Sequence, residues 1–272
     1  MITGSRASLL SRELETRLTG RHINLELFPF SFSEYLDIRN EELSSITFKQ
    51  YIEEGGSPIY LKSRKPEILR QLLKDIVQCD IVSRYNLRSS KIIMKMALYL
   101  LTNIGREFSY SNLARTYNLG STNTAISFVS YLEDSYLLFT VPRFYFSLRK
   151  QQISPRKIYS IDNGLLSANS VFFSFDLGRI LENNVFLHLR RFYGEIFYFS
   201  KNKECEFLVK VRNATKLCIQ VTLELNNDNK DREISGLLEA MEEVKMDEGL
   251  IVTYDHCSAP VIFVGIDRRH CL

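Results

Sequence analysis

The sequence predicts a multidomain protein of mixed α+β and α/β class. The chain has 272 residues, which is long for one domain and comfortable for two or three. Residues 108–147 carry the pattern of a helix-turn-helix followed by β-rich runs. Residues 177–266 alternate predicted helices and strands, as an α/β domain does. We expect domains over residues 1–85, 86–168 and 169–272.

Composition places the chain among ordinary globular proteins. Hydrophobic residues make up 45% and charged residues 25% of the sequence, which excludes a disordered chain. The five cysteines are scattered and form no C-x-x-C pair, as is typical of reduced thiols in the cytoplasm. The apolar run from Ile92 to Leu101 is broken by Lys95 and is too short to cross a bilayer. We therefore expect a cytoplasmic protein with no membrane partner.

The helix-turn-helix pattern begins at Ser109, which is a suitable N-cap for a helix over Tyr110 to Tyr117. Gly120 can adopt positive φ in the turn, and Ser121 or Thr122 caps the second helix. That helix has one apolar stripe, made of Ala125, Phe128, Val129 and Leu132. Two β-rich runs, Leu137 to Val141 and Arg143 to Leu148, flank Pro142 and are predicted to form the wing of a winged helix.

Two helices are predicted ahead of this module and a strand and turn behind it. Pro66 stands at the first position of a long helix, where its missing N–H costs nothing. The buried face of that helix is predicted to consist of Leu69, Leu72, Leu73, Ile76 and Val77. Ser89 or Ser90 caps the next helix, which Asn103-Ile104-Gly105 ends. Lys157 to Ile161 is predicted as a short strand and Asp162-Asn163-Gly164 as a turn.

The charge pattern bears on DNA binding. The second helix, from Ser121 to Asp134, contains no Lys or Arg, and phosphate contacts supply most of the affinity for DNA. The stretch from Arg143 to Lys157 contains no acid, and its basic residues are Arg143, Arg149, Lys150, Arg156 and Lys157. These five residues are the DNA-contact candidates, which makes DNA a candidate partner. The alternatives are a solvated basic loop and a winged helix that serves as a packing spacer.

The C-terminal third predicts an α/β domain with a defined order of elements. Leu177 to Phe192 is an amphipathic helix, and three strands follow it. The predicted strands are Ile196–Ser200, Glu206–Val211 and Leu217–Leu223. Next come a helix over Arg232–Val244, a strand over Leu250–Thr253 and a further run over Val261–Ile266. Helix, three strands, helix, strand is the order of the PD-(D/E)xK nuclease core, a restriction-endonuclease-like fold.

Several stretches carry a resemblance to a known family. They are ITGS, LLSRELETRLTGR, LELFPFSFSEYL and the turn Glu54-Gly55-Gly56-Ser57-Pro58, followed by LENNVFLHL, FYFSKNKECEFLVK and CIQVTLEL. Together they resemble archaeal and bacterial AAA-type ATPases whose C-terminal half is the domain DUF4143. The resemblance implies that residues 1–85 are the C-terminal remnant of an ATPase domain with its helical lid. It also implies that Thr3 or Ser5 is a sensor on the γ-phosphate side.

The sequence departs from that family at the nucleotide site. No Gly-Lys pair occurs, so the G-x-x-x-x-G-K-[ST] phosphate loop is absent, as is an apolar strand ending in Asp-Glu or Asp-Asp. The resemblance implies that these elements lie before Ile2, in an N-terminal ATP-binding segment. That segment and other ATPase subunits are then expected partners. We expect no cofactor in this chain, with ATP and Mg²⁺ implied for the full-length family.

The resemblance also implies a nuclease-like site that has lost part of its machinery. A helix Glu, a strand acid and an E-x-K on the next strand hold Mg²⁺ in active members. Glu182 and Glu206 match the two acids, whereas Gln220 replaces the second strand acid and Thr222 replaces the lysine. Arg232 or Lys230 could supply the missing cation. We therefore expect no metal site.

The leading interpretation is a non-catalytic C-terminal portion of a DUF4143-type ATP-binding protein. One alternative is a metal-dependent nuclease that uses Glu182, Glu206 and Gln220. The other is a DNA-binding winged-helix protein.

Overall fold

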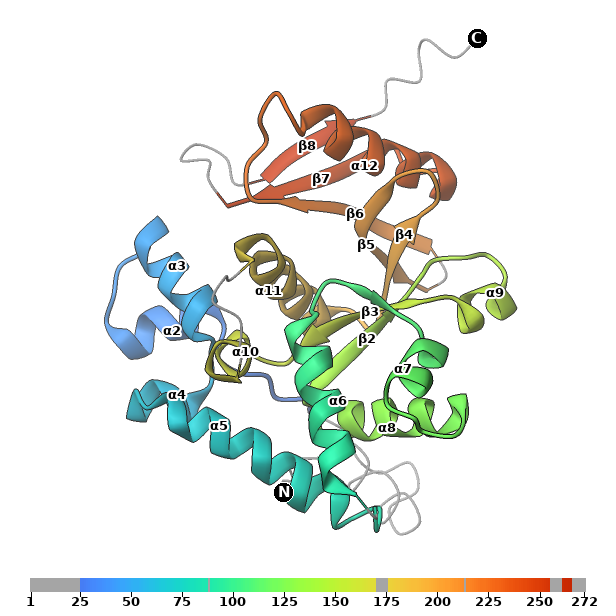
Figure 1. The fold of residues 1–272 in the computed structure, drawn as a ribbon. Helices are drawn as coiled ribbons and strands as arrows, with labels where there is room; N and C mark the ends of the chain where they lie inside the picture. Colours follow the sequence, from blue (N-terminus) through green and yellow to red (C-terminus); the bar gives the residue numbers. More distant parts are fainter. Residues whose placement is uncertain (1–24, 88, 170–175, 213, 255–260, 266–272) are drawn as a thin grey trace. The chain divides into compact units, whose positions relative to one another are not determined.

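The computed structural model describes residues 25–87, 89–169, 176–212, 214–254 and the strand at 261–265. The described chain is a mixed α and β structure with two sheets, and it divides into two compact units (Figure 1). Unit 1 contains residues 25–140 and 158–169, and unit 2 contains residues 141–157 and those from 176 onward. Most residues of the first two predicted domains therefore belong to unit 1. A short segment of the second predicted domain, residues 141–157, belongs to unit 2 and is called the excursion.

Unit 1 is mainly helical. Its helices are α2 (Phe32–Arg39), α3 (Ser45–Glu54), α4 (Pro58–Ser63), α5 (Pro66–Asp75), η1 (Ile76–Val82), α6 (Ser90–Thr102), α7 (Tyr110–Thr116), α8 (Thr122–Asp134) and α10 (Asn163–Asn169). Its sheet has the strand order β1-β3-β2, from β1 (Glu107–Phe108), β3 (Arg156–Ser160) and β2 (Leu138–Pro142). The chain passes between the two units near the ends of β2 and β3.

The predicted helix pair is confirmed at its caps. The Ser109 hydroxyl accepts the Asn112 N–H and begins α7, and the Ser121 hydroxyl accepts the Thr124 N–H and begins α8. Gly120, in the turn between them, has a φ of 75°. The stripe on α8 is buried at Ala125, Val129 and Leu132 and packs with α6 in the core of unit 1.

The helix that begins at Pro66 changes character halfway along. Pro66 is at the start of α5 as predicted, but regular α-helix ends at Asp75. The chain continues as a π-helix over Ile76–Val82, where the Ser83 N–H reaches the Gln78 carbonyl. Leu69, Leu73, Val77 and Ile81 all remain buried, so the wider turn keeps the apolar face on the core.

The predicted wing is wrong in its second strand. The first run is β2, but β2 pairs with β3 and not with residues 143–148. Pro142 has a fixed φ and no N–H, so the chain leaves this sheet after it. In unit 2, Arg143 instead bridges to Tyr198, and the Phe144 N–H donates to the Tyr198 carbonyl at 2.7 Å. The residues that follow form a short helix, α9 (Leu148–Ile153).

Unit 2 contains the five-stranded sheet in the order β4-β5-β6-β7-β8. The strands are β4 (Glu195–Ser200), β5 (Glu204–Val211), β6 (Ala214–Thr222), β7 (Glu248–Thr253) and β8 (Val261–Gly265). All neighbours are antiparallel except β6 and β7, which are parallel. Helix α12 (Lys230–Val244) makes the crossover that a parallel pair requires. Helix α11 (Leu177–Phe192) has its predicted bounds, and the predicted order of helices and strands is confirmed.

Helices α11 and α12 cover opposite faces of this sheet. The Phe207 ring on β5 lies 6.4 Å from the ring of Phe186 on α11. Its neighbour Leu208 belongs to the buried cluster that includes Leu237 and Met241 of α12. Successive residues of a strand point to opposite faces, so the two helices lie on opposite sides of β5.

A buried carboxylate ties two glycine turns together in unit 1. Asp162 is almost fully buried, and its Oδ2 accepts the Gly56 N–H at 2.7 Å while its Oδ1 accepts the Leu165 N–H at 3.1 Å. A side chain at Gly55, whose φ is 77°, would overlap the Asp162 carboxylate. A side chain at Gly164 would overlap the Glu54 carbonyl. The turn at Asp162 was predicted, but its role as the partner of the Gly55-Gly56 turn was not.

Unit 1 should lose stability as pH rises through the titration of Asp162. Burial raises the pKa of Asp162 to about 6, although backbone N–H groups of Gly56 and Leu165 oppose the shift. The folded state therefore holds a proton that the unfolded state releases near pH 4. Stability is greatest below that pH and falls by on the order of 2–3 kcal/mol by pH 6.

Asp162→Asn removes this dependence. Between pH 4 and pH 6 the unfolding free energy of the wild type should fall relative to that of Asp162→Asn, because only the wild type has a group that ionises here. Urea unfolding measures it, with the exposed Asp37→Asn as control. Parallel pH curves for wild type and Asp162→Asn would contradict the assignment.

Candidate functional site

The candidate site in unit 2 is a lysine among carboxylates. Lys157, on β3, is 2% exposed, and its Nζ lies 3.1 Å from Glu182 Oε1 and 2.6 Å from Glu204 Oε1. Glu182 comes from α11 and is itself buried, whereas Glu204 begins β5 and is half exposed. Three elements distant in sequence therefore bring their charges to one point.

Glu206 is the third carboxylate of this cluster. Its Oε2 accepts the Val221 N–H at 3.2 Å. Burial raises the pKa of Glu206 to about 8, the Lys157 cation opposes the rise, and Glu182 adds to it. Burial therefore disfavours the charged form of Glu206. Burial acts to lower the pKa of Lys157, but the charges of Glu182, Glu206 and Glu204 together raise it above its ordinary value, so the lysine is fully charged.

Gln220 and Thr222 occupy β6 but make other contacts. Gln220 is buried, and its Nε2 donates to Glu233 Oε2 on α12 at 2.6 Å. The other oxygen of Glu233 pairs with Arg232. The Thr222 hydroxyl donates to the Glu224 carbonyl at 3.0 Å. Gln220 therefore links α12 to the sheet. Arg232 pairs with Glu233, and the charges of Glu233 and Glu206 raise the pKa of Arg232, so this cation also interacts with the cluster.

Lys157 is the cation that the sequence analysis missed at this site. It was counted among the DNA-contact candidates, but it is buried and paired with two carboxylates, whereas a surface contact to DNA needs an exposed cation. Its partners lie far away in the sequence, so no spacing rule could have named them. One local signal was present, because Lys157 lies two and four positions before the apolar Tyr159 and Ile161 on a predicted strand, so the three side chains share one face.

The other predicted site residues are scattered. Arg149 and Lys150 are exposed on α9, whereas Arg143 and Arg156 are partly buried. The Arg143 guanidinium lies over the Tyr145 ring, 5.3 Å from its centroid. Thr3 and Ser5 lie outside the described residues. Across the described ranges, no group of three or more His, Cys, Asp and Glu side chains is arranged to hold a metal ion.

Comparisons with known proteins match the chain in two parts. Residues 1–36 match an AAA domain, and residues 45–175 match the domain of unknown function DUF8612. The first match is a likeness of the first 36 residues to an AAA domain. The second names a domain other than DUF4143, so the resemblance to DUF4143 chains stays a prediction. No solved structure matches.

Two relatives cover most of the chain. An uncharacterized protein of Methanocaldococcus jannaschii is 35% identical over 299 residues, which is 100% of this chain and 66% of the relative. An uncharacterized protein of Haemophilus influenzae is 27% identical over 257 residues, 90% of this chain and 64% of the relative. The chain thus spans just under two thirds of the curated relatives it matches. Within the described residues, no helix is both long and apolar enough to span a membrane.

Replacing Lys157 by Met should destabilise unit 2 by about 2–4 kcal/mol, because the buried Glu182 loses its cation. Chemical unfolding followed by tyrosine fluorescence measures the loss, with Lys203→Met, an exposed lysine of the same unit, as control. Adding Glu182→Gln to Lys157→Met should recover part of the stability, since the remaining buried group is then neutral. Additive losses in the double variant would show that the two side chains do not interact.

Proposed function

We propose that the chain is a non-catalytic accessory portion of an AAA-type ATPase, and that unit 2 is a nuclease-like domain that cuts nothing. The observation that carries the proposal is the Lys157 ammonium seated between Glu182 and Glu204. In an active nuclease the acids at such a position hold a divalent cation. Here the chain's own lysine neutralises them.

The AAA match over residues 1–36 supports the ATPase part of the proposal. The chain also spans just under two thirds of its relatives, so further segments of such proteins are candidate partners. In this proposal the phosphate loop and the Mg²⁺ carboxylates belong to an N-terminal ATP-binding segment of the family. Thr3 or Ser5 would sense the γ-phosphate, and ATP with Mg²⁺ would be the cofactor of the whole assembly.

The order and pairing of elements support the nuclease-like part. A helix, three strands, a crossover helix and a parallel strand follow one another in unit 2, with α11 and α12 on opposite faces. Glu182 on α11 and Glu206 on β5 belong to one electrostatic cluster, as the nuclease resemblance requires. These two acids come from the elements that the PD-(D/E)xK pattern assigns to them.

Charge is the reason for proposing that the site is inactive. Mg²⁺ prefers carboxylates and retains its waters, so it needs negative charge at the site. Burial raises the pKa of Glu206, so this acid gives up its proton less readily than an ordinary glutamate. Glu182 and Glu204 are already paired with Lys157, and Gln220 donates to Glu233. A metal would have to displace both a proton and an ammonium group.

A metal-dependent nuclease is the second candidate, and one observation favours it. Lys157 interacts with Glu182 and Glu206. It therefore supplies the cation that Thr222, at the lysine position of the nuclease pattern, cannot supply. In that case Lys157 would stabilise charge developing on a phosphate when metal takes the carboxylates. Activity would then rise as pH passes 8 and Glu206 ionises.

Unit 1 is proposed to contain a winged helix. Helices α6, α7 and α8 and the sheet β1-β3-β2 have the composition and order of such a module. The exposed start of α8 contains Thr122 and Asn123 but no basic side chain. The DNA-contact candidates that are exposed, Arg149 and Lys150, lie on α9 in the other unit. A DNA-binding protein remains the third candidate.

The nuclease question is tested by cleavage of supercoiled plasmid and single-stranded DNA with Mg²⁺ or Mn²⁺ at pH 7 and pH 9. We expect no cleavage above background, because Gln220 replaces an acid and Thr222 replaces the lysine of the nuclease pattern. Each electrostatic contribution lost in this way is typically worth about 10²–10³ in rate. The matched variants are Glu206→Gln in the site and Glu248→Gln, an exposed acid at the start of β7. Nicking that disappears in Glu206→Gln but persists in Glu248→Gln would establish the nuclease and reject the proposal.

DNA contact has a separate test. If the chain binds duplex DNA, Arg149→Ala with Lys150→Ala should weaken binding equally on two unrelated sequences. Two lost phosphate contacts should also make the negative slope of log K against log salt less steep by about 1.8. Fluorescence anisotropy at several salt concentrations measures both, with Lys201→Ala and Lys203→Ala as the control pair. A loss on one sequence alone, caused by Asn123→Ala, would show base readout instead.

A further inference from the structure

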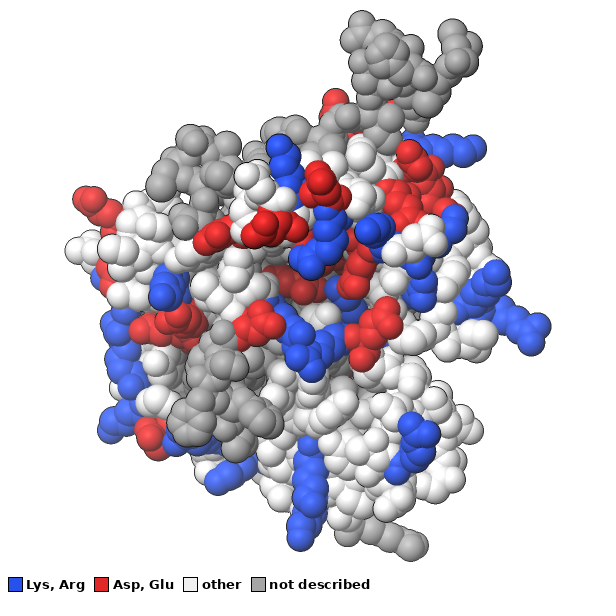
Figure 2. All heavy atoms as spheres, turned by 45° about the horizontal axis from the view of Figure 1, so that its top comes forward, with Lys and Arg blue, Asp and Glu red and all other residues white. Residues whose placement is uncertain are grey.

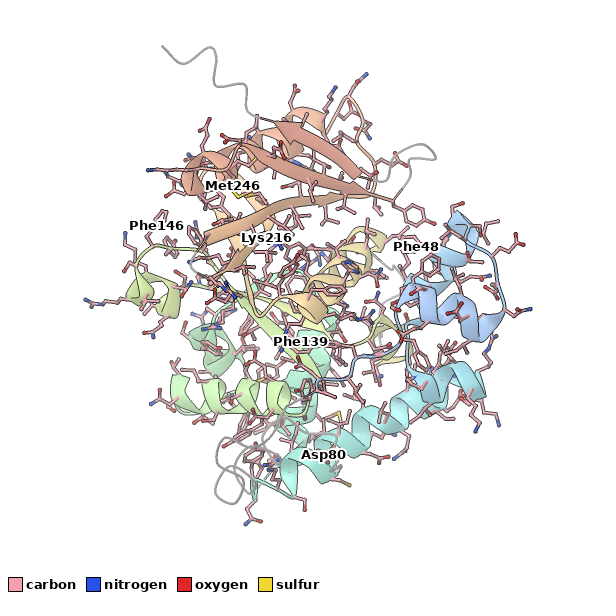
Figure 3. The ribbon with its side chains drawn as sticks, turned by 180° about the vertical axis from the view of Figure 1, so that it is seen from behind. Phe48, Asp80, Phe139, Phe146, Lys216 and Met246 are labelled. Carbon is pink, nitrogen blue, oxygen red and sulfur yellow. The ribbon has the colours of Figure 1, made fainter. Side chains whose placement is uncertain are left out.

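Unit 2 presents an apolar and basic surface around α9, which we call the α9 patch. Its apolar side chains are Phe146, Leu148 and Ile153, which are 75%, 73% and 77% exposed. Arg149 and Lys150 are exposed on the same short helix, and no acid occurs from Arg143 to Lys157. Figure 3 shows Phe146 beside α9, and Figure 2 shows basic side chains gathered at the α9 edge. The patch is open to a partner.

Unit 1 presents a surface of opposite charge where α2 leads into α3, which we call the α2–α3 patch. Its apolar side chains are Ile38, Leu43 and Ile46, which are 51%, 78% and 70% exposed. Residues 34–46 contain the acids Glu34, Asp37, Glu41 and Glu42. Their one basic residue, Arg39, has an 8% exposed side chain that pairs with Glu41 and Glu54. The exposed charge of this patch is therefore negative.

Single exposed apolar residues are normal on a protein surface and carry no meaning. These two patches differ because each gathers three large apolar side chains within a span of nine residues or fewer. Each also lies in a stretch of net charge, positive over residues 143–157 and negative over residues 34–46, although the exposed Lys49 on α3 lies one turn beyond Ile46. Two α9 patches, or two α2–α3 patches, would repel each other because their charges have the same sign. An α9 patch and an α2–α3 patch would match in both charge and apolar area.

We propose that the α9 patch of one chain binds the α2–α3 patch of a second copy of this chain. The two patches differ, so the contact is head-to-tail and leaves one patch of each kind free at the ends of a pair. Association can then continue to further copies. In this arrangement the exposed apolar side chains of the two patches meet, and the positive charge of one patch lies against the negative charge of the other. This inference does not depend on whether unit 2 is nuclease-like.

The test is sedimentation equilibrium of the purified chain from about 10 to 500 μM. We expect the average mass to rise with concentration above the 31.7 kDa of one chain. We also expect the association to weaken about threefold to tenfold between 50 and 500 mM salt, because surface charges are screened. A chain that stays monomeric over this range would overturn the proposal, even if it bound DNA or anionic vesicles.

Two variants test the head-to-tail arrangement. Leu148→Glu with Ile153→Glu removes the α9 patch, and Leu43→Lys with Ile46→Lys removes the α2–α3 patch. All four side chains are exposed, so both variants should keep the wild-type melting temperature. Each variant alone should be monomeric. Mixed in equal amounts they retain one intact pair of patches, and should form a dimer that grows no further.

Ile59→Lys is the matched control, since Ile59 is an exposed apolar residue outside both patches. It should associate like the wild type. Self-association that survives in the Leu43→Lys, Ile46→Lys variant would mean that the α9 patch pairs with itself or with another surface, and would overturn the proposal. A mixture of the two variants that shows no dimer would do the same.

Discussion

The ammonium group of Lys157 is the charge on which unit 2 depends. It is buried, and a buried charge is stable only when paired and hydrogen-bonded. Its partners come from α11 and β5, so one side chain joins β3 to a helix and a strand that form the rest of the site. The excursion of residues 141–157 places Lys157 there, and its pairing of Phe144 with Tyr198 fixes the path of the chain.

The same charge gives a common reason for the two departures from the nuclease pattern. An acid at position 220 would add a buried negative charge opposite Glu233, whereas Gln220 donates a hydrogen bond to it. A lysine at position 222 would add a cation where Lys157 already neutralises the carboxylates. Gln220 and Thr222 are therefore consistent with a site whose charges are satisfied internally.

Local patterns were sufficient for the elements but not for the contacts between them. Period-two alternation identified the strands of unit 2, and Ser109 and Ser121 identified the starts of α7 and α8. The wing was wrong because Phe144, Phe146 and Leu148 alternate like a strand, yet Pro142 takes them out of the sheet and leaves two of them exposed. Lys157 was misread because its role depends on Glu182, which lies twenty-five positions away in the sequence. Side-chain chemistry alone cannot distinguish a lysine that meets phosphate from one that meets buried carboxylates.

The two units hold their carboxylates with different partners. Backbone N–H groups hold Asp162 in unit 1, and a lysine side chain holds Glu182 and Glu204 in unit 2. Burial raises the pKa of Asp162, and its backbone N–H donors oppose that rise. Its carboxylate is enclosed by glycines at positions where a side chain would overlap other atoms. Such a group is fixed in place and holds two turns together. Glu182 and Glu204 are held by a flexible lysine stem, and Glu204 is half exposed. An ammonium group on four methylenes can move without unfolding the strand that carries it, whereas a backbone N–H cannot. If either buried cluster can exchange its present partner for another cation, it is the one around Lys157.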